Sequence, residues 1–240
     1  MTDKLYHECH EAVCQTRTLL EELSAWGFAS LPEPASGFSP ADEKRPAGMA
    51  AQAGAHSLEE LGVMLKDCTR CGLSRTRSKV VIGRGNPRAR LVFVGEAPGQ
   101  QEDQQGQPFV GEAGRLLDRI IQAMGLTSDE VYICNVIKCR PPGNRDPEPE
   151  EIATCEPFLQ QQLALIRPQV IVALGRFSAQ TLLATSRPIS KLRGSWHQYA
   201  GICLMPTFHP AYLLRSPAEK KRVWQDMKQV MQRLSAEKEG

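Results

Sequence analysis

Short apolar runs alternate with stretches of helical periodicity from Leu58 to the C-terminus. The runs are short enough for buried strands, and the stretches between them carry apolar residues every three or four positions, as amphipathic helices do. The expected strands are Val80–Ile82, Leu91–Val94, Val131–Val136, Val170–Leu174 and Ile202–Met205. The expected helices are Leu58–Asp67, Glu112–Met124, Pro147–Ile166, Phe177–Thr185 and Pro217–Leu234. This alternation predicts a three-layer α/β/α fold around a central, mostly parallel sheet of about four strands.

The N-terminal part of the chain has a different pattern. Apolar residues recur at mostly helical intervals within residues 1–30, which predicts an amphipathic helical extension. Residues 31–56 are rich in Pro, Ala, Gly and Ser without periodicity and predict a flexible linker. Ser57 is a suitable N-cap for the next helix, with Glu60 at the capping-box position, so the main domain is expected at residues 57–240. The extension is expected to pack on that domain or, alternatively, to dock a protein partner.

Composition narrows the class of protein. The chain has 240 residues, 41% hydrophobic and 23% charged, and no apolar run approaches the length of a membrane span. The polar N-terminus lacks an apolar signal region, so we expect a cytoplasmic protein without membrane association. Residues 1–57 carry a net charge of −4 and residues 58–240 a net charge of +6. A mildly basic domain suits contact with phosphate backbones, although many solvated surfaces are equally basic.

The eight cysteines favour metal or redox chemistry, because disulfide frameworks are rare in the cytoplasm. Four of them lie next to expected elements: Cys68, Cys71, Cys139 and Cys155. The first pair forms a CxxC motif, and the last lies on a helix for which Asp146 provides an N-cap and Pro147 the first position. The pattern predicts a four-thiolate metal site, but spacing alone does not separate zinc from an iron–sulfur cluster. The alternative, ordinary buried thiols, is the interpretation we adopt for Cys9, Cys14, Cys134 and Cys203.

Ligands of parallel sheets bind at the carboxyl ends of the strands, which directs attention to Gly95, Asn135 and Thr207. The first of these ends runs into a turn in which glycines allow close approach of a ligand. Carboxylates and an aromatic ring follow, at Glu96, Glu102 and Phe109. There is no GxGxxG motif and no Walker lysine, so a phosphate-binding loop is not indicated.

Four longer motifs occur in order: GEAPGQQED at 95–103, GQPFVGEAGRLLD at 106–118, NVIKCRPPGNRDP at 135–147 and FHPAYLLR at 208–215. From about Leu58 onward the chain resembles the family 4 (thermostable-type, iron–sulfur) uracil-DNA glycosylases of the uracil-DNA glycosylase superfamily. The resemblance implies a monomeric DNA-repair enzyme that excises uracil from single- or double-stranded DNA. It also implies a [4Fe–4S] cluster on Cys68, Cys71, Cys139 and Cys155. A covalently trapping branch carries a basic, histidine-containing insertion after the third motif, which this chain lacks.

The resemblance also assigns roles in the pocket, where an extruded base must be read. Phe109 would stack on uracil, Asn135 would contact N3 and O4, and His209 would stabilise negative charge at O2. The expected substrate-binding set is Gly95, Glu96, Ala97, Gly99, Phe109, Asn135 and His209. The alternatives are a core Phe, a strand-end Asn that caps a turn and a structural His.

Catalysis is assigned to Glu96, Glu102, His209 and Asn135. The activating aspartate of family 1 enzymes falls where this chain has Ala97, so the two glutamates remain to position water or to stabilise a cationic sugar. The segment at Leu213, Leu214 and Arg215 resembles the family's minor-groove loop, and either leucine would be the intercalating wedge. The alternative is a helix that packs these leucines into the core.

Two other functions were weighed. A non-catalytic iron–sulfur module of the same fold, associated with DNA or a polymerase, would not need to keep Glu96, Asn135 and His209 together. A ferredoxin-like electron carrier is disfavoured because the cysteines are dispersed along the chain. The sequence therefore favours the glycosylase.

Overall fold

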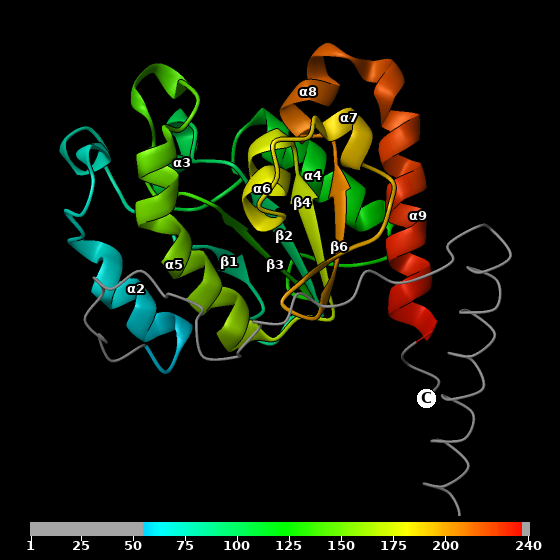
Figure 1. Cartoon of the computed structure of the whole chain (residues 1–240), viewed down its shortest axis with the longest axis horizontal. Helices are drawn as coiled ribbons and strands as arrows, with labels where there is room; N and C mark the ends of the chain where they lie inside the picture. Colours follow the sequence, from blue (N-terminus) through cyan, green and yellow to red (C-terminus); the bar gives the residue numbers. More distant parts are fainter. Residues whose placement is uncertain (1–54, 237–240) are drawn as a thin grey trace, which may run out of the picture. The chain divides into compact units, whose positions relative to one another are not determined.

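The structure, a computed structural model, describes residues 55–236. The extension expected at residues 1–30 and the linker up to residue 54 lie outside this range. Six strands form one sheet in the order β1-β3-β2-β4-β6-β5 (Figure 1). They are β1 (Arg84–Gly85), β2 (Leu91–Gly95), β3 (Val131–Asn135), β4 (Val170–Leu174), β5 (His197–Tyr199) and β6 (Ile202–Thr207). The helices are α2 (Leu58–Lys66), α3 (Gln100–Gln105), α4 (Glu112–Ala123), α5 (Pro149–Ile166), α6 (Arg176–Leu182), α7 (Ile189–Leu192), α8 (Pro210–Arg215) and α9 (Lys220–Ala236).

The four central strands β3, β2, β4 and β6 are parallel, which confirms the mostly parallel sheet. The two short edge strands are antiparallel to their neighbours. The strand expected at Val80–Ile82 is wrong: Val81 donates one backbone hydrogen bond to the carbonyl of Lys138, and pairing begins only at Arg84. Strand β5 was not predicted, because its three residues are partly exposed and include no apolar run.

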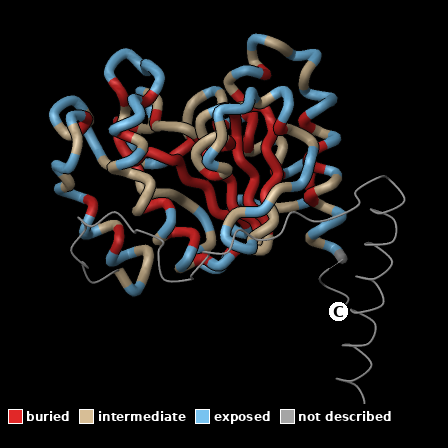
Figure 2. Tube along the Cα trace, in the orientation of Figure 1, coloured by how far each residue is buried: buried red, intermediate tan, exposed pale blue. Residues whose placement is uncertain are grey.

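Successive side chains of a strand point to opposite faces of the sheet, so each strand contributes to two cores. Val92 and Val94 pack against residues of α5 and α6 on one face. Leu91 and Phe93 pack against α4, α8 and α9 on the other face. Figure 2 shows the buried strands between partly exposed helices. The three-layer α/β/α arrangement is thereby confirmed. Within the described range, no helix is long and apolar enough to cross a membrane.

The register of the sheet brings the strand ends together. Gly95 at the end of β2 pairs with Asn135 at the end of β3, and Leu174 pairs with Thr207 across β4 and β6. Parallel strands in this register place their carboxyl ends along a single edge of the sheet. The loops that carry the expected site residues therefore start from neighbouring positions.

The predicted start of α2 is confirmed, whereas α5 starts two residues after its predicted position. Ser57 caps α2, accepting a hydrogen bond of 3.1 Å from the backbone N–H of Glu60. Helix α5 begins later than expected: Glu148, not Asp146, is its N-cap, and Pro149, not Pro147, is its first residue. A residue that precedes proline is disfavoured in helical conformation, so Glu148 must stay extended and the helix starts after it.

Candidate active site

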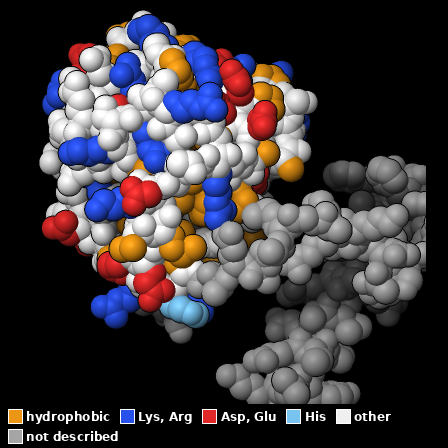
Figure 3. Space-filling model, turned by 90° about the vertical axis from the view of Figure 1, so that its left-hand side faces the viewer, with side chains coloured by type: hydrophobic (Ala, Val, Ile, Leu, Met, Phe, Trp, Pro, Cys, Tyr) orange, Lys and Arg blue, Asp and Glu red, His pale blue; other side chains and the backbone are white. Residues whose placement is uncertain are grey.

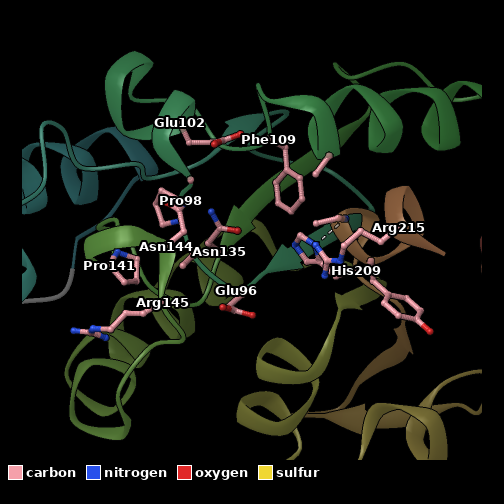
Figure 4. A pocket seen from close by; sticks show the side chains of 15 residues that line it. Glu96, Pro98, Glu102, Phe109, Asn135, Pro141, Asn144, Arg145, His209 and Arg215 are labelled. Atoms are coloured by element: carbon pink, nitrogen blue, oxygen red, sulfur yellow. Dashed lines mark hydrogen bonds between the residues drawn. The ribbon is translucent and has the colours of Figure 1, made fainter. Parts of the chain in front are cut away.

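A cavity of about 460 Å³ opens at the carboxyl ends of β2 and β3, beside the start of α8 (Figure 4). It is lined by Glu96, Ala97, Pro98, Gly99, Glu102, Phe109, Ala113, Asn135, Pro141, Asn144, Arg145, His209, Ala211, Tyr212 and Arg215. Every residue expected to bind substrate lines it, apart from Gly95. All four sequence motifs thus meet in one cavity.

Gly95 lies behind the cavity wall and makes room for two of its groups. A Cβ atom at this position would come within 2.6 Å of Cζ of Phe109 and would also collide with Oδ1 of Asn135. The absence of a side chain therefore allows the aromatic ring and the amide to approach each other. Gly95 does not contact the cavity; it shapes the site by leaving room for Phe109 and Asn135.

Phe109 is 6% exposed and is held in an unusual backbone conformation. Its φ angle of +54° lies in the left-handed region, which non-glycine residues rarely adopt. The ring faces that of His209, with centroids 5.6 Å apart and planes inclined by 31°. Arg84 donates to the carbonyl oxygens of Pro108 and Phe109 at 3.0 and 3.4 Å. The strained residue is therefore fixed by its neighbours, with its ring in the cavity.

Asn135 is 2% exposed, and a buried lysine holds its backbone. The ammonium group of Lys138, itself 1% exposed, donates 2.6 Å to the carbonyl oxygen of Asn135 and also bonds to Oε1 of Gln162. Gln162 on α5 in turn donates 2.9 Å to the carbonyl of Ile82 and 3.3 Å to the hydroxyl of Tyr132. A buried polar network thus fixes the end of β3 against α5.

His209 is the N-cap of α8, and its Nδ1 accepts the backbone N–H of Ala211 at 3.1 Å. Burial lowers the pKa of its imidazole to about 4, and the charge of Arg215 adds to this effect. The ring is therefore neutral at neutral pH. Because Nδ1 accepts a hydrogen bond, the proton of the neutral ring is assigned to Nε2. His209 can then donate from Nε2 without carrying a charge.

Glu96 follows β2 directly and is partly buried. In Figure 4 its carboxylate lies toward the space between Asn135 and His209. Burial, together with the negative charge of Asp146, raises the pKa of the Glu96 carboxyl to about 7, and the positive charge of Arg176 opposes this shift. Asp146 and Arg176 form an ion pair at 2.8 Å. The pocket carboxyl thus titrates in the physiological range.

Glu102 also lines the cavity, but its carboxylate has other partners. Its Oε1 accepts the backbone N–H groups of Val110 and Gly111, both at 2.9 Å. The two expected catalytic glutamates therefore differ in their surroundings. Within residues 55–236, no group donates a hydrogen bond to the carboxylate of Glu96, whereas Glu102 holds the backbone that follows Phe109.

The segment expected to enter DNA is a short helix, α8. Leu213 is 0% exposed and packs in the core with Val223 and Met227, so its assignment as a wedge is wrong. Tyr212, 38% exposed, and the half-buried Leu214 lie on either side of it, with Arg215 exposed after them. The helical turn explains the difference, because consecutive residues of a helix point in different directions.

The cavity also contains residues that sequence reasoning missed. Pro141, Asn144 and Arg145 form one wall from the segment between β3 and α5. Arg145 is held by both carboxylate oxygens of Glu151, at 2.7 and 2.9 Å. The third motif contained these residues, but only the turn of backbone after Cys139 brings them beside Asn135.

The four expected metal-ligating cysteines line one small cavity between α2, the end of β3 and α5. None of the four forms a disulfide bond. Arg77 donates to Sγ of Cys139 at 3.4 Å, and the backbone N–H of Lys138 donates to Sγ of Cys155 at 3.3 Å. In residues 55–236, no three Cys, His, Asp or Glu side chains lie close enough to share a single metal ion. Cys134 and Cys203, assigned as ordinary thiols, lie in β3 and β6.

Lys and Arg side chains are spread over the side of the domain that bears α2 and α5, with Asp and Glu between them (Figure 3). The excess of positive charge expected from residues 58–240 is therefore dispersed on this face. It does not by itself mark a binding surface there.

Sequence comparisons with known proteins cover the same motifs that line the cavity. The family sequence model described as the uracil DNA glycosylase superfamily matches residues 82–228. A type-4 uracil-DNA glycosylase of Thermotoga maritima is 46% identical over 69% of this chain and 87% of its own length. Those of Saccharolobus solfataricus and Sulfurisphaera tokodaii are 41% and 43% identical over 75% and 72% of this chain, and 88% and 83% of their own lengths. The matched region contains all of the motifs that meet in the cavity, and the chain belongs to the type-4 uracil-DNA glycosylases of the uracil-DNA glycosylase superfamily.

Proposed function

We infer that this protein hydrolyses the N-glycosidic bond of uracil flipped out of DNA and so initiates base excision repair. The observation that carries the inference is the convergence of Phe109, Asn135 and His209 in one cavity (Figure 4). An aromatic face, an amide and a neutral imidazole are the groups needed to bind an extruded pyrimidine and to stabilise it as it leaves. We propose that it acts as a monomer.

Base recognition is assigned to Phe109 and Asn135. The ring of Phe109 would stack on the base, and the amide of Asn135 would donate to O4 and accept from N3–H. Cytosine presents an amino group in place of O4, so it would leave buried polar atoms unpaired at a cost of about 1–3 kcal/mol each. The network of Lys138 and Gln162 keeps the Asn135 backbone in place for this reading.

Bond breaking is assigned to His209 and Glu96. As the glycosidic bond breaks, negative charge develops on the base, and Nε2–H of His209 would donate to O2. The sugar becomes cationic, and the Glu96 carboxylate would stabilise that charge and position the attacking water. The anionic form of Glu96 is required for both tasks.

Contact with DNA is assigned to the start of α8. Tyr212 and Leu214 are the apolar side chains of this segment with exposed surface, and they replace Leu213 as candidates for the group that fills the space of the flipped base. Arg215, exposed at the end of the helix, is placed to contact the phosphate backbone.

The cysteine site fits a [4Fe–4S] cluster. Four thiols share one cavity, with Arg77 and the backbone of Lys138 donating to two of the sulfurs. Such a cluster binds each thiolate through a different iron, so it takes thiolates farther apart than those around one zinc ion. Cys68, Cys71, Cys139 and Cys155 would hold it, and it would supply structural cross-linking of the α2 end, the β3 end and α5.

The function is tested by incubating the purified full chain with an oligonucleotide that contains one uracil. Alkali-labile abasic sites should appear on single-stranded and double-stranded substrates, and none on the matched cytosine strand. A folded protein that binds DNA without forming abasic sites would favour the alternative, a non-catalytic module of the same fold.

Replacing His209 with Ala should lower the single-turnover rate of uracil excision by about 10²–10³-fold, the effect of losing one oxyanion donor. Binding to uracil-containing DNA should change little, because the donor acts mainly on charge that develops during bond breaking. Rapid-quench kinetics and fluorescence anisotropy measure the two quantities. A folded variant with the rate of the unmodified protein would remove His209 from the mechanism.

The rate should depend on pH through Glu96. The required carboxylate is protonated below its pKa of about 7, so the single-turnover rate should rise with pH and level off above about pH 7. Asp146→Asn removes a negative charge that raises this pKa and should move the midpoint to lower pH. Arg176→Gln removes a positive charge and should move it to higher pH. Shifts of the opposite sign would exclude Glu96 as the titrating group.

Protein purified without oxygen should be brown and contain about four irons per chain. Cys139→Ser should lower both the iron content and the yield of folded protein, because loss of a ligand removes binding free energy that stabilises the fold. Cys203→Ser is the matched control and should retain the iron. Colourless protein with one zinc per chain would refute the cluster and leave the glycosylase assignment intact.

Residues 1–56 are proposed to be a helical extension and linker that the reaction does not require, with docking of a protein partner as their alternative role. In the part of the chain that the structure describes, the residues that line the cavity lie between Glu96 and Arg215. A protein that begins at Ser57 should therefore excise uracil at the rate of the full chain in the same single-turnover measurement. A folded but inactive truncated protein would contradict this division.

A further inference from the structure

Glu102 and Glu96 are both pocket carboxylates, yet the contacts of Glu102 indicate a different task. We propose that Glu102 is a positioning residue that holds Phe109 in its left-handed conformation, and that it takes no part in the chemistry. The proposal rests on the proposed function, because it assigns a role to one residue of the uracil pocket.

The first argument is the geometry of the carboxylate. Oε1 of Glu102 accepts the N–H groups of Val110 and Gly111, each at 2.9 Å. These are the two amides that directly follow Phe109. A single oxygen that accepts two consecutive amides fixes the direction in which the backbone leaves Phe109. Hydrogen bonds to a charged acceptor are about twice as strong as neutral ones, so the carboxylate can hold this backbone firmly.

The second argument is that the backbone needs such a support. Phe109 has φ +54°, and a conformation of this kind persists in a non-glycine residue only where its surroundings impose it. From the other side, Arg84 donates to the carbonyls of Pro108 and Phe109 and pairs with Asp118 at 2.6 Å. Arg84 therefore binds the carbonyl groups of the peptide units before and after the Phe109 Cα, and Glu102 binds the two amides that follow it.

The third argument concerns the start of α4. Gly111 is the N-cap of this helix and has no side chain to accept the free amides. The carboxylate of Glu102, on the separate helix α3, instead accepts the amide of the N-cap residue itself, as the acidic residue of a capping box does, and its negative charge suits the positive end of the helix dipole. Helix α3 is itself secured by Asp103, which accepts the N–H groups of Ser78 at 2.9 and 3.0 Å and of Lys79 at 3.3 Å.

The glycines around Glu102 agree with a packed support. A Cβ on Gly99 would lie 2.6 Å from Oε2 of Glu102, and one on Gly111 would lie 3.3 Å from Oε1. Glycine at both positions lets the carboxylate approach the two amides. These glycines serve the contact between Glu102 and the loop, as Gly95 serves the contact between Phe109 and Asn135.

The test compares the same isosteric change at both pocket glutamates. A glutamine side-chain oxygen can accept both amides, so Glu102→Gln should excise uracil within about threefold of the unmodified chain. Glu96→Gln, which loses the carboxylate charge, should be strongly impaired. Glu102→Ala should lose about 10- to 100-fold in single-turnover rate, because two charged hydrogen bonds disappear and Phe109 is no longer oriented. The rise in rate near pH 7 should persist in Glu102→Ala.

A second measurement does not depend on activity. Hydrogen exchange should show protected amides at Val110 and Gly111 in the unmodified chain and in Glu102→Gln, and loss of that protection in Glu102→Ala. If Glu102→Ala does not fold, the comparison of the two glutamine variants still decides. The proposal is overturned if Glu102→Gln is as slow as Glu96→Gln, or if Glu102→Ala is fully active.

The two inferences fail in distinguishable ways. An unmodified chain that forms no abasic site refutes the proposed function, and the exchange pattern at Val110 and Gly111 then still tests the support of Phe109. If the unmodified chain excises uracil and the Glu102→Gln variant does not, the positioning role alone is refuted and Glu102 is again a candidate catalytic residue.

Discussion

The pairing of β2 with β3 is the constraint on which the site depends. Its register sets Gly95 beside Asn135, and the two loops that leave these residues carry Glu96 and the wall formed around Pro141. A shift by one residue would send each side chain to the opposite face of the sheet. Different side chains pack the cores on the two faces of the sheet, so such a shift would disrupt the packing on both faces. The chemistry of the pocket is thus positioned by hydrophobic packing.

Polar contacts then fix the pocket residues that the sheet brings together. Each residue proposed to read the base is held at its backbone: Asn135 by the ammonium of Lys138, and Phe109 by Arg84. Lys138 is buried beside neutral oxygens and near thiols, a costly position for an ammonium group unless its hydrogen bonds are made. The same short segment leads from Asn135 to Cys139. The amide proposed to read the base and the cysteine cavity are therefore joined by one short stretch of backbone.

The sequence was sufficient where apolar pattern and boundary signals agreed. Val170–Leu174 was predicted with the bounds that β4 has, since a β-branched run lies between Pro168 and Gly175. It was insufficient where neighbouring residues offered equal signals. Two prolines compete for the start of α5, and three bulky apolar residues follow His209 without showing which one turns inward.

The pocket residues were found through the motifs, and their partners were not. Nothing in the run before Cys139 indicates that Lys138 is buried, because lysine is almost never buried. The different tasks of Glu96 and Glu102 depend on which backbone amides lie nearby, and these come from a separate segment. Hydrogen bonds between distant segments produce no periodic pattern in the amino-acid sequence.

The positive φ of Phe109 has a consequence for how this protein can evolve. Glycine or asparagine would suit the backbone at that position better, since they tolerate the left-handed region, and relief of strain there is worth about 1–3 kcal/mol. Either exchange would remove the aromatic face of the pocket. Burial of the ring among core residues is worth about 3–5 kcal/mol, more than that relief, so an exchange at position 109 would cost both stability and the wall of the pocket.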